Sequence, residues 1–432
     1  MTKQIKYSTG IEQIPEGYKL EYGYVIPKEW KVVRFDKCFH RLTRKNAENN
    51  QNVLTISAQQ GLISQLDYYN TLYASEDKTG YFLLQKGDFA YNKSYSTDYA
   101  YGAIKQLEKY EKGIVSPLYI CFSANKDTNT DFYRQYFEGG RFNREIYKIA
   151  QEGARNHGLL NVSTPEFFSA ALVYPPVAEQ KKIAEILAQC DKVIELKRQR
   201  IEEEKNKKRW ILEKTMKMPK GILGSSNKYT GTLEDLVSKI ETGTSVNSID
   251  DVNSTIDSNH KFVLKTSAIC DGVFIETECK KVVPEDYNRT SCTVESGTLL
   301  VSRMNTPKLV GACAVCYKSL PNVYLPDRLW KVSVKATVDP RWLNYILNSA
   351  QYKNLIQERA GGTSNSMKNI SQKDFLGLPI SPPPYEKQVI VGDTLSSIDN
   401  LIQKLEEEVD AWMQKKKLMM QLLLTGIVRV NP

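Results

Sequence analysis

The sequence predicts an α+β protein in which two mixed α/β domains are each followed by a long helix. The two helices are expected to pair as an antiparallel coiled coil with pseudo-two-fold symmetry. The first observation is an apolar pattern at every third or fourth position from Ile183, which is the 3.5-residue period of a coiled-coil seam. The second is the same pattern in the same register 208 residues later, from Val391. The predicted seam residues are Ile183, Leu187, Ile194, Ile201, Val391, Leu395, Ile398, Ile402, Leu405 and Val409.

Proline runs mark the start of both predicted helices. Pro175-Pro176 precedes the first and Pro382-Pro383-Pro384 precedes the second, and proline is tolerated just before or within a first helical turn. Pro219 and Gly221 close the first helix, and Gly426 closes the second. Each helix should contain roughly 40 residues and span about 60 Å. A lone helix of that length would expose its apolar seam, so we expect the two seams to bury each other.

The predicted helices divide the chain into five segments. These are an N-terminal segment with the first mixed domain (1–176), the central helix (177–218), a Gly/Ser-containing linker (219–228), the second mixed domain (229–384), and the C-terminal helix and tail (385–432). Within the mixed domains we expect strands at Lys31–Phe35, Ile114–Cys121 and Ala170–Tyr174, helices at Phe132–Ala150 and Trp342–Arg359, and a short helical start at Leu233–Ile240.

The two mixed domains share one order of short motifs. Gly297–Arg303 matches Gly87–Lys93, and Asn369-Ile370-Ser371 matches Asn161-Val162-Ser163. The sequences upstream of these motifs differ most. A repeated scaffold that carries two different domains suits two half-sites on a DNA duplex. A two-headed protein adaptor could be built in the same way, so this pattern leaves both classes open.

The composition is that of an ordinary globular chain with a mild basic excess. The 432 residues carry a net charge of +9, which permits a polyanionic partner without requiring one. We expect no membrane span, because the sequence lacks a run of 18 apolar residues, and no signal peptide at the N-terminus. The eight cysteines are scattered, as is typical of reduced thiols, and we therefore expect a cytoplasmic protein.

The sequence offers no convincing catalytic or metal-binding motif. The three histidines have no metal-ligand spacing, no Walker-type phosphate loop is present, and Cys313 and Cys316 form a lone CxxC best explained by strand alternation. The run Pro382-Pro383-Pro384-Tyr385 resembles a methyltransferase tetrapeptide, but its first residue has no polar group and its prolines suit the helix entry. We therefore expect a binding protein with no catalytic residues, no metal and no cofactor of its own.

The candidate DNA-contacting residues lie in polar loops of both mixed domains. Arginine can form a bidentate pair with guanine, and either arginine or lysine can hold a phosphate. Glycine-flanked loops with polar side chains suit contacts to base edges or to the backbone. The candidates are Lys93, Tyr95, Tyr99, Arg155, Asn156, His157, Arg303, Asn305, Lys308, Thr363, Ser364 and Asn365.

Short motifs recur along the chain: Val25–Trp30 near the N-terminus, Gly87-Asp88 and Gly297–Arg303 within the domains, Asn161–Ser163 and Asn369–Ser371 before the helices, and Pro175–Ile183 and Pro383–Gln388 at the helix starts. Taken in order, these motifs resemble those of the specificity (S) subunit of a type I restriction–modification system. Two positions depart from the repeat: Lys387 stands where the first copy has Glu179, and Thr298 where it has Asp88.

This resemblance implies a non-catalytic DNA-binding subunit that serves defence against foreign DNA. Two target recognition domains would each read one half of a bipartite site in double-stranded DNA. The helices would act as spacer and as dock for two methyltransferase (M) subunits, with restriction (R) subunits joining through the complex. Adenine-specific DNA methylation and ATP-dependent cleavage would then belong to those partners.

Two other classes compete with this interpretation. A coiled-coil scaffold whose domains bind proteins would show no salt-dependent affinity for DNA, whereas neutralised phosphates give a steep salt dependence. A nuclease or methyltransferase chain would be active alone with donor or metal, and the missing motifs argue against it.

Overall fold

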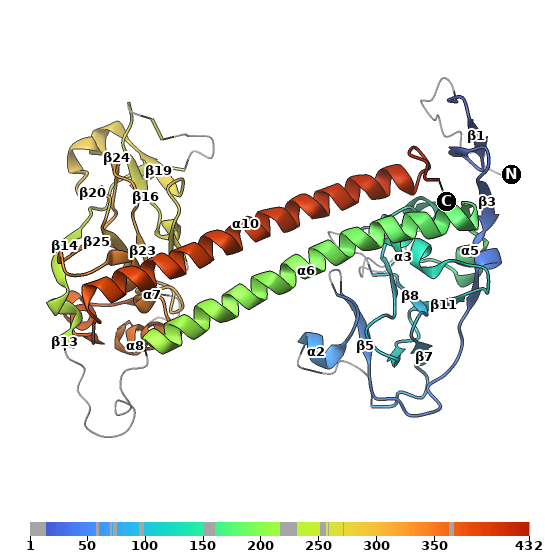
Figure 1. Ribbon diagram of the computed structural model, residues 1–432, viewed down its shortest axis with the longest axis horizontal. Helices are drawn as coiled ribbons and strands as arrows, with labels where there is room; N and C mark the ends of the chain where they lie inside the picture. Colours follow the sequence, from blue (N-terminus) through green and yellow to red (C-terminus); the bar gives the residue numbers. More distant parts are fainter. Residues whose placement is uncertain are drawn as a thin grey trace. The chain divides into compact units, whose positions relative to one another are not determined.

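The computed structural model describes residues 14–57, 60–69, 71, 76–94, 99–150, 160–216, 231–250, 256–257, 259–270, 272–362 and 367–431 (Figure 1). The chain divides into two compact units. Unit 1 comprises residues 1–197 and 408–432, and unit 2 comprises residues 198–407. Both boundaries fall inside the two long helices, α6 (Val177–Met216) and α10 (Tyr385–Leu423), so each unit contains a segment of each helix.

Unit 1 contains small antiparallel sheets and short helices before α6. Its elements are β1 (Tyr18–Glu21), β2 (Tyr24–Pro27), β3 (Lys31–Arg34), α1 (Phe35–Cys38), β4 (Phe39–Arg41), β5 (Leu54–Ser57), β6 (Gly61–Ser64), α2 (Gln65–Tyr69), β7 (Phe82–Gln85), β8 (Phe89–Asn92), β9 (Ala103–Gln106), β10 (Lys112–Val115), β11 (Ile120–Ala124), α3 (Thr130–Glu138), α4 (Asn143–Ile149), α5 (Thr164–Ser169) and β12 (Ala171–Tyr174).

Unit 2 has the same mixture of elements before α10. They are β13 (Gly231–Thr232), η1 (Leu233–Asp235), β14 (Val237–Thr242), β15 (Ser248–Ile249), β16 (Phe262–Leu264), η2 (Thr266–Ala268), β17 (Ile269–Cys270), β18 (Val273–Phe274), β19 (Cys279–Val282), η3 (Pro284–Arg289), β20 (Thr293–Val294), β21 (Leu299–Ser302), β22 (Met304–Asn305), β23 (Cys313–Val315), β24 (Leu320–Tyr324), β25 (Leu329–Val334), α7 (Pro340–Leu347), α8 (Ala350–Arg359), β26 (Lys368–Asn369), α9 (Gln372–Leu376) and β27 (Pro379–Ile380).

The central sheets of the two units have the same topology. Unit 1 orders its four antiparallel strands β4-β11-β8-β9, and unit 2 orders its counterparts β14-β25-β21-β23. In each unit the strand that precedes the long helix pairs with a strand from the start of that unit, as β12 with β3 and β27 with β13. The repeat seen in the sequence is therefore also a repeat of strand order.

Matching residues make matching local contacts at the start of each long helix. The amide of Gln180 donates to the carbonyl of Pro175, and the amide of Gln388 donates to that of Pro383, each at 2.8 Å. Ser163 caps α5 and Ser371 caps α9 by accepting a backbone N–H bond. Such caps satisfy donors that have no partner within the helix. The proline run that ends before Tyr385 is thus a helix entry.

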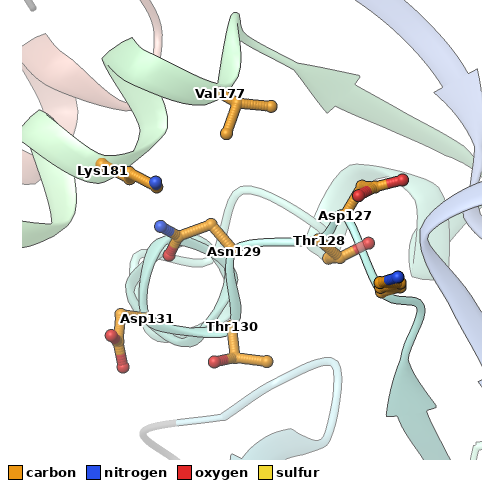
Figure 2. A pocket seen from close by; sticks show the side chains of 8 residues that line it. Asp127, Thr128, Asn129, Thr130, Asp131, Val177 and Lys181 are labelled. Carbon is orange, nitrogen blue, oxygen red and sulfur yellow. The ribbon is translucent and has the colours of Figure 1, made fainter.

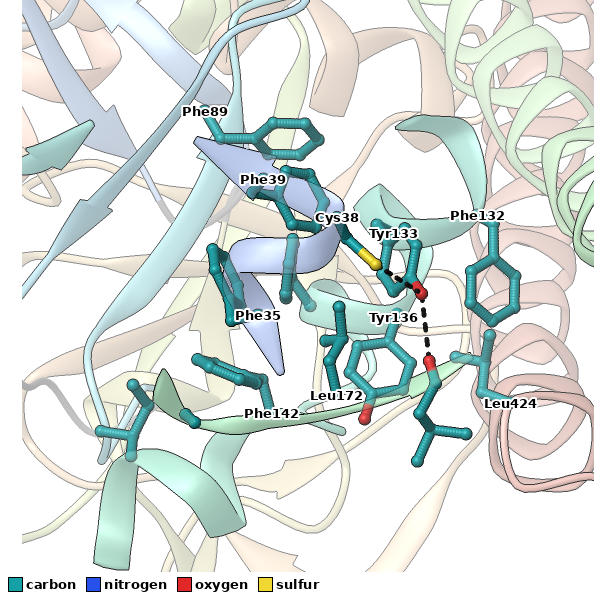
Figure 3. Packing of buried hydrophobic residues seen from close by; sticks show 14 of the residues in the cluster. Phe35, Cys38, Phe39, Phe89, Phe132, Tyr133, Tyr136, Phe142, Leu172 and Leu424 are labelled. Carbon is teal, nitrogen blue, oxygen red and sulfur yellow. Dashed lines mark hydrogen bonds between the residues drawn. The ribbon is translucent and has the colours of Figure 1, made fainter. Parts of the chain in front are cut away.

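An aromatic core fills unit 1. Figure 3 shows Phe35, Phe39 and Phe89 packed near Tyr133 and Tyr136. Phe89 stacks on Phe122 with ring centroids 5.3 Å apart. The hydroxyl of buried Tyr133 donates to the carbonyl of Val173 and so satisfies its one polar group. Residues of both long helices complete this core: Ile183, Ala184, Leu187, Met420, Leu423 and Leu424.

Within each unit the segments of α6 and α10 face each other in antiparallel order. In unit 1, Asp191 pairs with Lys416 at 2.5 Å and Lys197 pairs with Glu408. In unit 2, Lys205 pairs with Glu406 at 3.4 Å and Lys208 with Asp399 at 2.5 Å. As the residue number rises on one helix it falls on the other.

The predicted seam residues are largely sheltered from solvent. Val391 and Leu405 are half-buried, whereas eight of the ten are buried: Ile183, Leu187, Ile194, Ile201, Leu395, Ile398, Ile402 and Val409.

The predicted α+β class with two long helices is confirmed, but four shorter elements were predicted wrongly. The expected strand Ile114–Cys121 is two strands, because residues 116–119 form a turn between β10 and β11. The expected helices Phe132–Ala150 and Trp342–Arg359 are each two helices, the first broken at Gly139-Gly140, where Gly140 has φ +66°. Leu233–Ile240 is one 3-10 turn followed by strand, because β14 pairs with β25.

Replacing Leu187 by alanine should lower the free energy of unfolding by about 2–5 kcal/mol, because its fully buried side chain would leave a cavity in the unit 1 core. Denaturant titration of the full chain measures the change. Leu196, which is 54% exposed on the same helix, is the matched control, and Leu196→Ala should change stability by less than about 0.5 kcal/mol. Equal losses for the two variants would contradict the seam assignment.

Arg429 links three distant segments of unit 1. Its Nε and Nη2 donate to the two carboxylate oxygens of buried Glu179 at 2.8 and 3.0 Å, and its Nη1 donates to Glu29 at 2.8 Å. The indole of Trp30 donates to the same Glu179 carboxylate at 2.7 Å. These bonds raise the pKa of Arg429 above its ordinary value. They also explain why Glu179 differs from exposed Lys387 at the matching position.

Arg429→Met should destabilise the chain by about 1–3 kcal/mol, because it leaves the Glu179 carboxylate buried without its fork of donors. Arg429→Lys should restore little, since an ammonium cannot form the two parallel bonds. Thermal unfolding gives the comparison, with Arg34→Met as the control because Arg34 forms an exposed pair with Asp36. A loss no larger than that of the control would show that the fork contributes nothing.

Candidate nucleic-acid interface

Arg303 is fixed by its backbone at the end of β21. Its N–H donates to the carbonyl of Arg328, and its carbonyl accepts from the N–H of Ile370, each at 3.0 Å. These two bonds join the end of β21 to the turn before β25 and to the segment before α9. Three separate parts of unit 2 therefore meet at Arg303.

The side chain of Arg303 is half-buried and lacks a partner. Its Nε is sealed from solvent without a hydrogen bond, and no carboxylate among the described residues forms an ion pair with it. By contrast, the buried ammonium of Lys331 pairs with Glu241 and Glu295. A guanidinium without an anionic partner among the described residues is suited to bind acceptor atoms from outside the chain.

Basic side chains gather around Arg303. The pairing of β22 with β26 sets Asn305 opposite Lys368, whose ammonium donates to the carbonyl of Gly362 at 2.9 Å. Lys308 is exposed in the turn after β22, and Arg328 is exposed where its carbonyl meets Arg303. We name Arg303, Lys308, Arg328 and Lys368 the unit 2 basic cluster.

Asn305 uses its side-chain amide within the turn. Its Nδ2 donates to the Ser302 hydroxyl at 3.1 Å, and its Oδ1 accepts from the N–H of Thr306 at 2.8 Å. A bidentate contact with an adenine would need both of these atoms. Asn305 therefore shapes the turn that follows Arg303.

Lys93 occupies the matching position in unit 1. Its carbonyl accepts from the N–H of Leu160 at 2.9 Å, two residues before Val162, the motif counterpart of Ile370. The end of β8 is thereby joined to the segment before α5. The two units thus hold the same loop positions together, with a lysine in one and an arginine in the other.

Tyr99 belongs to a half-buried polar network. Its hydroxyl donates to Glu138 at 3.0 Å and accepts from the ammonium of Lys105 at 2.8 Å, and Lys105 also pairs with Glu138. Burial lowers the pKa of Lys105, but Glu138 and Tyr99 outweigh burial and hold that pKa above its ordinary value. Burial has the opposite effect on the Tyr99 hydroxyl, whose pKa it raises above the ordinary value. The network joins Tyr99 and β9 to α3.

Seven of the DNA-contacting residues predicted from the sequence are not among those that the structure describes. They are Tyr95, Arg155, Asn156, His157, Thr363, Ser364 and Asn365. Of the predicted residues, the structure brings Arg303, Asn305 and Lys308 together in unit 2. Sequence reasoning missed Arg328, Lys368, Lys105 and Glu138, because their importance arises from strand neighbours that the local pattern does not reveal.

A polar hollow of about 480 Å³ lies in unit 1 between the start of α6 and the start of α3 (Figure 2). Val177 and Lys181 line it from α6, opposite Asn129 and Asp131. Its lining holds two lysines, two aspartates and no histidine or cysteine.

The part of the chain that the structure describes contains no group of three or more His, Cys, Asp or Glu side chains placed to hold a metal ion. Cys313 and Cys316 are buried free thiols, the first of them in β23. Within the same described residues, every helix is too short or too polar to cross a membrane.

The architecture and the paired loop positions define an α+β two-unit repeat protein with a basic cluster at one loop position.

No protein-family model matches the chain. The chain is 23% identical over 437 residues to the type I restriction enzyme MjaVIII specificity subunit of Methanocaldococcus jannaschii, which covers 96% of this chain and 97% of that protein. It is also 23% identical over 153 residues to the EcoEI specificity subunit of Escherichia coli, or 35% of this chain and 26% of that protein.

Solved structures share the fold. A chain from a type I restriction–modification system assembly aligns with a TM-score of 0.52 and 16% identity, covering 94% of this chain and all of that chain. The type I S subunit from M. genitalium aligns with a TM-score of 0.51 and 11% identity, covering 94% and 97%. The resemblance to type I restriction enzyme specificity subunits, drawn above from the motifs, is confirmed along nearly the whole chain.

Proposed function

We propose that the chain is the DNA sequence-specificity subunit of a type I restriction–modification complex and reads a bipartite target. Residues 1–176 and 229–384 would be the two target recognition domains, joined by the helix 177–218 and the linker 219–228, with the second helix and tail at 385–432. The observation that carries this proposal is the unpaired guanidinium of Arg303, at a loop position matched by Lys93 in the other unit.

The repeat supports one half-site for each domain. Both units use the same sheet order, and in both a backbone N–H from the segment before the short helix binds one loop position, yet that position holds Lys93 in one and Arg303 in the other. A lysine offers a point charge, whereas an arginine offers a planar fork of donors. Two domains with equal scaffolds and unequal side chains suit two different half-sites.

The long helices are the proposed dock for two M subunits, with R subunits joining through the complex. Several of their apolar side chains face solvent, as expected of a surface that a protein partner covers: Leu196, Trp210, Ile390, Leu401, Met413 and Leu418. The chain itself would be non-catalytic, free of cofactors and cytoplasmic. Adenine methylation and ATP-dependent cleavage would be supplied by the partner subunits.

The test is a methylome, determined by single-molecule sequencing, of cells that carry the partner methyltransferase with and without this gene. A split motif with a methylated adenine on each strand should appear only when the gene is present. Exchange of residues 229–384 for another such domain should then change one half of the motif. An assembled complex that changes no motif would favour the alternative, a coiled-coil scaffold whose domains bind proteins.

A further inference from the structure

The geometry of Arg303 limits which of its atoms a ligand can reach. Both backbone polar groups are bound by distant segments, so the stem starts from a fixed point. The Nε is sealed from solvent. Neither Nη group donates a hydrogen bond to the described residues, so we take these two groups as the donors open to an outside ligand, which they would meet as an end-on fork.

An end-on fork selects among the four bases. Its two parallel N–H groups need two neighbouring acceptors on one base edge. In the major groove guanine presents O6 and N7, which both accept, whereas adenine sets a donor beside its one acceptor. Thymine presents one acceptor next to a methyl group, and cytosine presents a donor. Guanine is the base whose edge matches the fork.

A phosphate also has two acceptor oxygens, but other residues of the cluster are better suited to it. Lys308 and Arg328 are exposed, so their flexible side chains can reach the phosphates of a DNA backbone. Arg303 is half-buried and fixed, as a side chain that discriminates between bases must be. Asn305 cannot take this role, because both of its amide atoms are bound within the turn.

We propose that the two Nη groups of Arg303 bind a guanine in the half-site that unit 2 reads, and that Lys308 and Arg328 bind the flanking phosphates. This inference rests on the proposed function. Unit 1 has Lys93 at the matching position, and an ammonium cannot form the same fork. The half-site of unit 1 is therefore read without an arginine–guanine fork at this position.

The first test uses cells with the partner methyltransferase and compares the methylomes of the native chain, Arg303→Lys and Arg289→Lys. Arg303→Lys keeps the charge and should make one guanine position of one half-site degenerate while the other half stays unchanged. Arg289→Lys, the matched control, should leave every base unchanged, because Arg289 is an exposed arginine of unit 2 that pairs with Asp286 and lies outside the unit 2 basic cluster. A half-site without guanine, or a uniform fall in methylation with no change at any base, would overturn the inference. A native complex that makes no split motif overturns the proposed function itself.

The second test leaves the protein unaltered. The complex of this chain with its methyltransferase subunits is titrated with duplexes in which 7-deazaguanine replaces the selected guanine, which removes N7 and keeps base pairing. Native complex should bind this duplex about tenfold more weakly than the guanine duplex. Arg303→Met complex, which has no donor at this position, should bind both duplexes alike. Equal binding of both duplexes by the native complex would show that N7 is not contacted.

Discussion

Between 50 and 200 mM monovalent salt, the affinity of the chain for its target duplex should fall by about 100-fold. In the function that we propose, four described cations would meet phosphates: Lys93, Lys308, Arg328 and Lys368. Each neutralised phosphate releases condensed counterions, so four contacts give a slope of about −3.6 in a plot of log affinity against log salt.

Fluorescence anisotropy at a series of salt concentrations measures this slope. Lys308→Ala should make it shallower by about 0.9, because one phosphate contact is lost. Arg303→Met should weaken binding while the slope stays nearly constant, since a base edge carries no condensed counterion. An affinity that does not vary with salt would remove DNA as the partner and leave the protein-binding scaffold as the better account.

The long helices could be predicted from the sequence because their physics is local and periodic. Apolar positions from Ile183 and from Val391 recur at the coiled-coil spacing, and prolines fix both starts. The predicted first residues, 177 and 385, agree with the helix starts in the structure. The break at Gly139-Gly140 is also local, but the apolar pattern continues across it and hides the second helix start.

The interface depends on contacts that no local pattern reveals. Arg303 and Lys93 could be selected because each follows a strand motif that occurs twice. Arg328 joins Arg303 only through strand order, since its carbonyl meets Arg303 where β25 lies beside β21. The sequence also placed Tyr99 in an exposed loop, whereas its hydroxyl is bound by Lys105 and Glu138. Contacts between residues far apart in the sequence determine the positions of both Arg328 and Tyr99.

Lys105→Met should weaken recognition of the unit 1 half-site by about tenfold and leave the unit 2 half-site unaffected. Its side chain is only 10% exposed, and its ammonium joins Glu138 to the Tyr99 hydroxyl. Methionine keeps the stem but leaves Glu138 and Tyr99 without their shared donor, a loss of about 1–3 kcal/mol for a partly buried group. Tyr99 is then held to α3 less firmly.

Two duplexes separate this positioning role from a general loss of stability. One keeps the unit 1 half-site with a scrambled second half, and the other does the reverse. Lys105→Met should lower affinity for the first duplex alone, because the network that it breaks belongs to unit 1. The described part of unit 2 has no equivalent network, since its matching residues are Leu309, Val315 and Asn348. Lys86→Met removes an exposed pair with Glu111 in the same unit and should change neither affinity. If Lys105→Met lowers affinity for both duplexes equally, the network stabilises the chain as a whole and does not position Tyr99.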